Sequence, residues 1–469
     1  SPEMFLYPND FSFWQPADSI AIFKLLSLKM TGQIDAEITY AKALLTVNNK
    51  EMLSALLPDA PGNPISKLQN LEKFSSNNFQ QSKNKKNSMN LFNFPSLEFA
   101  GASNVFAATR ERSAAGGPLL ANDPHFELSA PSLFYLARLQ LNTGGVIGAS
   151  VPGTPIILGG RNEKLAWGIT ASYLDDQDIF IEELNLSNPK LYRTEEGWKE
   201  FKTDKQYIKV KNSSDIEIER RWTTNGPVLP DTAFDLSSIT PKNHVTTLSW
   251  TALTDKDTTI SSAINLMLSQ NVQNGLNALE NFQAPSLNFL LVDNEKMVLK
   301  TVGKMPRRSP LSQTQGKMPS PGWKLENKWR GYWGYEVNPI IISSPGDILG
   351  NTNNKITDTK FPKHVSHFWG DTQRILRWQK LMQNREVHTR ESFIEAQLDI
   401  VSPTARALLP IIGSELWYSQ PMGEAGSKER LRFDAISMLA SWNGEMSEHL
   451  PEPLIFSIWM KFLQKNLID

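Results

Sequence analysis

The chain lacks cysteine, although it is 469 residues long. This absence excludes disulfide bonds, thiolate metal sites and cysteine nucleophiles, but it leaves the redox compartment open, because exported bacterial proteins and cytosolic proteins can both do without cysteine. Strong charge of either sign is missing too, since the formal net charge is −1 at pH 7 and neither end carries an acidic or basic tail. We therefore expect no nucleic-acid partner.

Long apolar runs are also missing. No stretch of about 18 apolar residues occurs, so the sequence predicts no transmembrane helix and no membrane partner. Residues 1–5 lack the basic start and apolar run of a secretory signal. Hydrophobic residues make up 40% of the chain and charged residues 21%, which is typical of a globular protein whose length favours several lobes or one large layered domain.

Hydrophobic periodicity indicates a mixed α and β protein. Apolar residues at a helical period predict a helix that Asp18 caps and a second helix from Ile34 to Leu56, and helical patterns return from Thr389 onward. Strand patterns lie between these helical parts. They predict a buried strand at 156–158 and two antiparallel hairpins, 207–210 with 216–219 and 289–292 with 297–300.

Residues 74–93 form a polar stretch rich in Asn, Lys and Ser. Such a composition cannot bury enough apolar surface to support a packed core. The sequence therefore predicts a spacer or linker here, just before residue 103.

Four short sequence blocks carry the chemical signal. Ser103-Asn104 comes first, and an isolated Ser-Asn pair would be an ordinary turn dipeptide. It is followed by the blocks ANDPHF at 121–126, VPGTP at 151–155 and GGRNEKLAWGIT at 159–170. Together the blocks resemble the penicillin acylase family of N-terminal-nucleophile hydrolases.

The resemblance implies that Ser103 becomes the first residue of a chain released by self-cleavage after Ala102. A serine hydroxyl is a poor nucleophile at neutral pH and needs a base within hydrogen-bonding reach. A chain-terminal serine carries its own base, because its α-amino group titrates near ~8 and accepts the hydroxyl proton directly or through a water. No separate Ser/His/Asp triad is then required.

The family fold is an α+β, four-layer αββα sandwich of two antiparallel sheets flanked by helices, with Ser103 starting a central strand. By this resemblance residues 1–73 are the helical end of the small (α) subunit, 74–102 the linker peptide, and 103–469 the large (β) subunit, with both ends of the protein truncated. An upstream signal would then be missing, and the expected location is periplasmic or secreted.

The resemblance also assigns residues around the nucleophile. The backbone N–H of Ala171 and the side-chain amide of Asn353 would stabilise the oxyanion of the tetrahedral intermediate. Arg374 would hold Asn353 and bias the α-amine toward its neutral form, and His125 would hydrogen-bond near that amine or the substrate. The alternatives are a turn asparagine, a surface arginine and a structural histidine.

An acyl pocket is implied by three further positions. Phe126 and Ile169 would line it and make it apolar. Gly159 stands where phenylacetyl-preferring members carry an aromatic ring, so a wider pocket for an aliphatic chain is conceivable.

A calcium ion is implied by Glu37, Asp175, Asp178 and the carbonyl of Gln177, because oxygen ligands suit a hard cation. One family aspartate is replaced by Lys363, whose ammonium would neutralise the acids without a metal; a solvated acidic loop is the other alternative. His364 and His367 have a spacing that suggests zinc, but no Glu or Cys completes a ligand set.

The function implied is hydrolysis of the N-acyl amide of a small molecule, such as a β-lactam, an acyl-homoserine lactone or an N-acyl amino acid, through an acyl-Ser103 intermediate. It needs no organic cofactor. The expected partners are this substrate and the chain's own α and β fragments, which would form a heterodimer. The competing hypothesis is a non-catalytic remnant of the fold that serves as a structural or binding unit.

Overall fold

The structure is a computed structural model that describes residues 13–47, 102–126, 129–142, 144–370, 372–382, 385–416 and 423–468. The expected linker therefore lies outside the described residues, apart from Ala102. In the described part, no helix is both long and apolar enough to cross a membrane.

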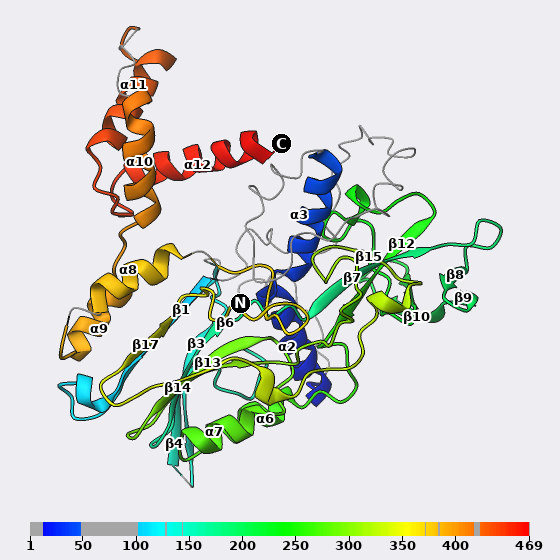
Figure 1. The fold of residues 1–469 in the computed structure, drawn as a ribbon, viewed down its shortest axis with the longest axis horizontal. Helices are drawn as coiled ribbons and strands as arrows, with labels where there is room; N and C mark the ends of the chain where they lie inside the picture. Colours follow the sequence, from blue (N-terminus) through cyan, green and yellow to red (C-terminus); the bar gives the residue numbers. More distant parts are fainter. Residues whose placement is uncertain are drawn as a thin grey trace.

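Most helices lie near the two ends of the chain, and the strands lie between them (Figure 1). The helices are α2 (Pro16–Met30), α3 (Gln33–Thr46), α6 (Thr259–Met267), α7 (Val272–Leu279), α8 (Gln373–Met382), α9 (Arg390–Gln397), α10 (Pro403–Leu416), α11 (Lys428–Ser441) and α12 (Glu452–Ile468). The strands are β1 (Ala102–Ala108), β2 (Leu119–His125), β3 (Tyr135–Leu141), β4 (Gly144–Ser150), β5 (Gly159–Arg161), β6 (Ala166–Ala171), β7 (Gln177–Glu183), β8 (Leu191–Thr194), β9 (Gly197–Glu200), β10 (Lys202–Ile208), β11 (Ile216–Trp222), β12 (His244–Trp250), β13 (Leu287–Val292), β14 (Met297–Val302), β15 (Ser320–Pro321), β16 (Ile340–Ile342) and β17 (Ile348–Asn351).

The strands form two main antiparallel sheets. The larger has seven strands in the order β16-β14-β13-β6-β5-β4-β3, and the smaller has three in the order β17-β1-β2. In the smaller sheet Ser103 pairs with Pro124 on β2, while Val105 pairs with Asn351 on β17. The start of β1 therefore lies beside the ends of both its neighbours. Further strands form the sheet β12-β7-β15 and the pairs β10-β11 and β8-β9.

The alternation of side chains along β1 explains how the two sheets pack. Val105 and Ala107 point to the larger sheet and join a buried cluster with Leu290. The residues between and after them, Phe106 and Ala108, point the other way and join a cluster with α8 and α9. Because successive strand residues face opposite sides, an apolar run such as 105–108 suits a strand buried on both faces.

Helices α6 and α7 cover the other face of the larger sheet (Figure 1). Leu266 and Leu279 from these helices share one core with Trp167 and Leu291. Phe23 of α2 belongs to the same core, so the first helix is packed into the body of the molecule. Helix α3 packs separately, against β7 and β12.

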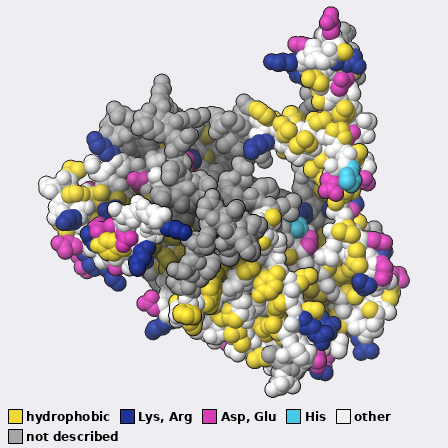
Figure 2. Space-filling model, turned by 180° about the vertical axis from the view of Figure 1, so that it is seen from behind, with side chains coloured by type: hydrophobic (Ala, Val, Ile, Leu, Met, Phe, Trp, Pro, Cys, Tyr) yellow, Lys and Arg dark blue, Asp and Glu magenta, His cyan; other side chains and the backbone are white. Residues whose placement is uncertain are grey.

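The C-terminal helices α10, α11 and α12 form a small unit with its own core, which includes Ala405, Leu439 and Phe456. Figure 2 shows this part projecting from the body of the molecule, with hydrophobic side chains on its surface. Those that are exposed include Leu454 and Phe462.

Both predicted hairpins are confirmed, as β10-β11 and β13-β14. Residues 156–158 are buried as expected but form a loop rather than a strand. Side chains replace strand partners for two backbone carbonyls of this loop. The carbonyl of Ile156 accepts from Ser150 Oγ, and that of Ile157 accepts from Trp167 Nε1. Helix α2 begins earlier than expected, since Gln15 is its N-cap and Asp18 is the third residue of the helix, which forms a capping box with Gln15. Helix α3 ends at Thr46 rather than Leu56, and 48–56 lie outside the described residues.

The contact between the two sheets leaves no room for a side chain at Gly168. A Cβ there would lie 2.5 Å from Val105 Cγ2 and 3.0 Å from Asn122 Cβ. We predict that Gly168→Ala lowers the free energy of unfolding by about 1–3 kcal/mol, because the sheets must separate to admit the methyl group. Urea unfolding measures this. The matched control is Gly117→Ala, where the nearest heavy atom would be 3.8 Å away; equal losses in the two variants would contradict the packing described.

Candidate active site

Ser103 lies at the start of β1, and its side chain faces a site built from three strand ends. The residue is 5% exposed. Ala171, the last residue of β6, and Asn353, two residues beyond the end of β17, both reach it. The structure thus brings together residues from three distant parts of the sequence.

Asn353 contacts Ser103 with both ends of its amide. Its Oδ1 accepts from the backbone N–H of Ser103 at 2.7 Å, and its Nδ2 donates to Ser103 Oγ at 3.2 Å. Nδ2 also donates to the carbonyl of Ala171 at 2.9 Å. This contact distinguishes the nitrogen of the amide from its oxygen, because a carbonyl can only accept. The asparagine therefore orients both the nitrogen and the hydroxyl of the serine.

The backbone of Asn353 is in the left-handed region, with φ 65°. Asparagine tolerates this conformation better than most residues. Gly370 packs directly on this turn: its N–H donates to the carbonyl of Asn353 at 3.0 Å, and a Cβ at Gly370 would come within 2.6 Å of that oxygen. Glycine at position 370 is thus required by the close approach of the two backbones.

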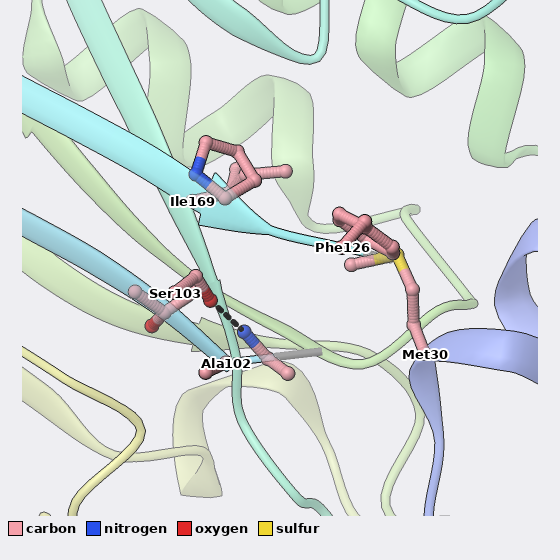
Figure 3. A pocket seen from close by; sticks show the side chains of 8 residues that line it. Met30, Ala102, Ser103, Phe126 and Ile169 are labelled. Carbon is pink, nitrogen blue, oxygen red and sulfur yellow. Dashed lines mark hydrogen bonds between the residues drawn. The ribbon is translucent and has the colours of Figure 1, made fainter. Parts of the chain in front are cut away.

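The N–H of Ala171 donates to Ser103 Oγ at 3.4 Å (Figure 3). Together with Asn353 Nδ2 it gives two donors that converge beside the hydroxyl oxygen. An acyl-transfer site needs donors beside the serine hydroxyl, from where they can reach the substrate carbonyl oxygen as it becomes an oxyanion.

Arg374, near the start of α8, contacts the backbone of Ser103 and the side-chain oxygens of Asn104 and Asn353. Its Nη1 donates to the carbonyl of Ser103 at 3.0 Å and to Asn104 Oδ1 at 2.9 Å, and its Nη2 donates to Asn353 Oδ1 at 3.1 Å. A guanidinium can make all three contacts because its N–H groups lie in one rigid plane. The partly buried arginine thus contacts Ser103, Asn104 and Asn353 together.

His125 lies next to this group without touching the nucleophile in any contact that the structure gives. Its Nε2 is 2.6 Å from Asp123 Oδ2 and 3.4 Å from Asn104 Nδ2, and its side chain is 41% exposed. Asn104 Nδ2 donates to the same Asp123 oxygen at 3.1 Å. Asn104 and Asp123 lie in the blocks that carried the resemblance, yet sequence reasoning assigned neither of them a role.

Asn122 ties the nucleophile strand to β6. Its Nδ2 donates to the carbonyls of Asn104 (2.8 Å) and Ile169 (2.9 Å), and its Oδ1 accepts from the N–H of Ile169 at 3.0 Å. Gly159 packs against this amide, where a Cβ would come within 2.8 Å of Asn122 Oδ1. The described geometry therefore gives Gly159 a packing contact with Asn122 rather than a place in the pocket wall.

A small pocket opens beside Ser103 (Figure 3). Phe126 and Ile169 line it as expected, and α2 contributes Met30, which sequence reasoning missed. Its other lining residues are Ala102, Ser103, Pro124, Thr170 and Ala171. Its volume of about 10 Å³ is room for roughly one water, so an acyl chain enters only if the lining side chains move.

The profile of the family described as penicillin amidase matches residues 1–469. The chain belongs to the penicillin amidase family. The mixed α+β fold agrees, because it matches the solved structure of a thermostable penicillin G acylase from Alcaligenes faecalis with a TM-score of 0.62. That match covers 77% of this chain and 64% of the acylase chain at 21% identity, and so it shows the fold alone.

Curated relatives of this penicillin amidase family member carry two kinds of name. The acyl-homoserine lactone acylase QuiP of Pseudomonas fluorescens (strain Pf0-1) is 25% identical over 97% of this chain and 56% of its own length. The penicillin G acylase of Escherichia coli is 24% identical over 78% of this chain and 42% of its own length. The chain spans about half the length of the curated relatives it matches, or less.

The expected calcium ligands do come together in this family member, but an arginine lies among them. Arg308, 3% exposed, donates to Asp178 and to the carbonyls of Asp175 and Gln177. Glu37 of α3 instead accepts from the N–H of Ile179, 3.2 Å from each carboxylate oxygen. The expected ligand oxygens of Asp175, Gln177 and Asp178 thus face a guanidinium, and these residues do not fit the implied metal.

Burial raises the pKa of Glu37 well above its usual range, and the neighbouring Asp178 and Asp175 raise it further. Burial also raises the pKa of Asp178, an effect that the Arg308 guanidinium opposes. Burying a carboxylate costs free energy unless the group is paired with a cation and hydrogen-bonded, and Arg308 provides both for Asp178.

Lys363 does not enter this cluster. It is exposed, and its Nζ lies 5.1 Å from the centroid of the Trp333 ring. The neighbouring Asp175, His364 and His367 form a buried group with ligand atoms within 4.8 Å of one another, which could hold a metal ion. Two imidazoles and a carboxylate suit a borderline metal such as zinc better than calcium.

We predict that Asn122→Ala lowers the free energy of unfolding by roughly 2–4 kcal/mol, because it leaves buried backbone groups of Asn104 and Ile169 without partners. Denaturant unfolding followed by tryptophan fluorescence checks this. Asn188→Ala is the control, since Asn188 is exposed and its loss should change stability by less than about 0.5 kcal/mol. Equal stability of the Asn122 variant and the parent would contradict the bridging role.

Proposed function

We propose that this protein hydrolyses the N-acyl amide of a small molecule through an acyl-Ser103 intermediate. The observation that supports it best is the convergence of the Ala171 N–H and the Asn353 amide on Ser103 Oγ. Family membership supports the same reaction class. The relatives are named for acyl-homoserine lactones and penicillins, and we infer a substrate of this type.

The nucleophile is produced by self-cleavage between Ala102 and Ser103. Ser103 Oγ attacks the carbonyl carbon of Ala102, the peptide C–N bond breaks as the nitrogen takes a proton, and an ester forms. Water then hydrolyses this ester. The products are the Ala102 carboxylate and a Ser103 that carries a free α-amine.

In the substrate reaction the freed α-amine accepts the hydroxyl proton as Ser103 Oγ attacks the acyl carbonyl. Asn353 Oδ1, which is 2.7 Å from the Ser103 nitrogen, orients that amine. The carbonyl oxygen becomes an oxyanion that accepts from Ala171 N–H and Asn353 Nδ2. The Arg374 cation favours the neutral amine. The leaving amine takes the proton, and water releases the acid from the acyl-enzyme.

The pocket supports an apolar acyl group, because Phe126, Ile169 and Met30 line it. Met30 belongs to the first helical part, so both fragments would shape the site. We infer that residues 1–73 form the end of the small subunit and 103–469 the large subunit, joined before cleavage by 74–102 and paired afterwards as a heterodimer. The location inferred for a member of this type is periplasmic or secreted.

We also infer that the core is a four-layer αββα sandwich. The packing of α6 and α7 on the larger sheet, of this sheet on β17-β1-β2, and of that sheet on α8 and α9 supports this arrangement.

We predict that the purified protein runs as two pieces on a denaturing gel, because Ser103 cuts its own chain. N-terminal sequencing of the larger piece should read Ser-Asn-Val-Phe, and Ser103→Ala should stay whole. A single uncut, inactive chain in the parent protein would favour the alternative of a non-catalytic remnant.

We predict that Asn353→Gly lowers turnover of an N-acyl substrate by roughly 10²-fold or more, because one of the two oxyanion donors is lost. Glycine is the suitable replacement since it adopts φ 65° without strain. Substrate binding should change less, because the charge exists only in the transition state. Asn188→Gly serves as the control, and equal turnover of the Asn353 variant and the parent would remove Asn353 from this role.

A further inference from the structure

We propose that Arg308 takes the place of the metal ion at the carboxylate cluster, so that the stability of this protein does not depend on calcium. This inference concerns the cluster of Glu37, Asp175, Asp178 and the Gln177 carbonyl. It does not rest on the proposed reaction, and its tests need no substrate.

One nitrogen of Arg308 reaches most of these oxygens at once. Nη2 lies 2.8 Å from Asp178 Oδ1, 3.0 Å from Asp175 Oδ1, 3.0 Å from the carbonyl of Asp175 and 3.3 Å from that of Gln177. Nε lies 2.9 and 3.1 Å from the two carboxylate oxygens of Asp178. The guanidinium thus sits where its positive charge faces carboxylate and carbonyl oxygens on one side, as a bound cation would.

The guanidinium and a calcium ion exclude each other here. Calcium needs oxygens at about 2.3–2.6 Å on several sides. An ion among these oxygens would overlap with Nη2, and the two positive charges would repel strongly in a site where both partners are buried. Calcium can therefore enter only if the arginine leaves.

The surroundings hold Arg308 in this place. The ring of Trp329 lies 5.8 Å from its guanidinium carbon, and the Trp329 indole N–H donates to Asp178 Oδ2. On another side is Gly316, where a Cβ would come within 2.7 Å of Arg308 Nε and 3.0 Å of Asp175 Oδ2. The glycine, with φ 78°, lets its loop close over the ion pair.

The cluster joins the first helical part to the strand that carries an oxyanion donor. The loop that holds Asp175 follows directly after Ala171 and leads into β7, which begins at Gln177. Helix α3 binds the same region, through Gln33 Nε2 to the Tyr173 carbonyl (2.8 Å) and through Glu37 to the Ile179 N–H. Arg308 therefore fixes the loop on which α3 docks.

Thermal unfolding in calcium and in EGTA tests the proposal. We expect the parent protein to have the same midpoint in both, and metal analysis to find no stoichiometric calcium. Arg308→Ala should lower the midpoint in EGTA by about 5 °C or more, because it leaves buried carboxylates unpaired. Millimolar calcium should restore part of that loss, since the vacated space is lined by oxygen ligands.

Further variants separate the effect of the charge from that of the guanidinium geometry and supply a control. Arg308→Lys retains the positive charge but loses the planar set of guanidinium N–H donors. Its unfolding midpoint should therefore lie between those of the parent and the alanine variant. Lys363→Ala is the matched control and should leave the midpoint unchanged. If Arg308→Ala does not fold, the neutral variant Arg308→Gln carries the test, and its midpoint should rise with calcium.

Three results would overturn the proposal. The first is a parent midpoint that rises with calcium or falls with EGTA. The second is stoichiometric calcium in the purified parent protein. The third is a neutral Arg308 variant, Arg308→Ala or Arg308→Gln, that matches the parent in EGTA or whose midpoint calcium leaves unchanged.

Discussion

The amide of Asn353 is the contact on which the rest of the site depends. It joins the nitrogen and the hydroxyl of Ser103 to the carbonyl of Ala171, and so it connects three distant parts of the chain. Its orientation is fixed from both ends, because Arg374 donates to its oxygen while its nitrogen donates to Ser103 and Ala171. An amide held in this way needs little reorganisation when negative charge develops beside it.

The fold supports this contact through close backbone approaches. Gly168 lets β6 pack against the nucleophile strand, Gly370 lets its own segment lie against the turn of Asn353, and Asn122 bridges β6 and β1. Behind the strand end that carries Ala171, the Arg308 ion pairs hold the following loop. Ser103 is thus positioned by packing that extends well beyond the residues that touch it.

The sequence was informative where a local pattern decides the structure. The alternating strands of both hairpins predicted these two elements, and the family resemblance pointed to Ala171, Asn353 and Arg374, which contact Ser103 in the structure. It was less informative where distant segments meet. Arg308 lies 130 residues from Asp178, and no local pattern reveals that its guanidinium replaces the expected ion. Likewise, Gly159 could be matched to a pocket position, but its contact with the Asn122 side chain depends on the tertiary fold.

The most direct test of the account is covalent labelling of the purified protein with a sulfonyl fluoride, followed by intact-mass measurement and peptide mapping. The reagent modifies a serine hydroxyl only where a base activates it and donors stabilise the sulfonyl oxygens. The account predicts one stoichiometric adduct, located on Ser103, that is absent from Ser103→Ala. An unlabelled parent protein, or an adduct on another serine, would contradict an activated nucleophile at this site.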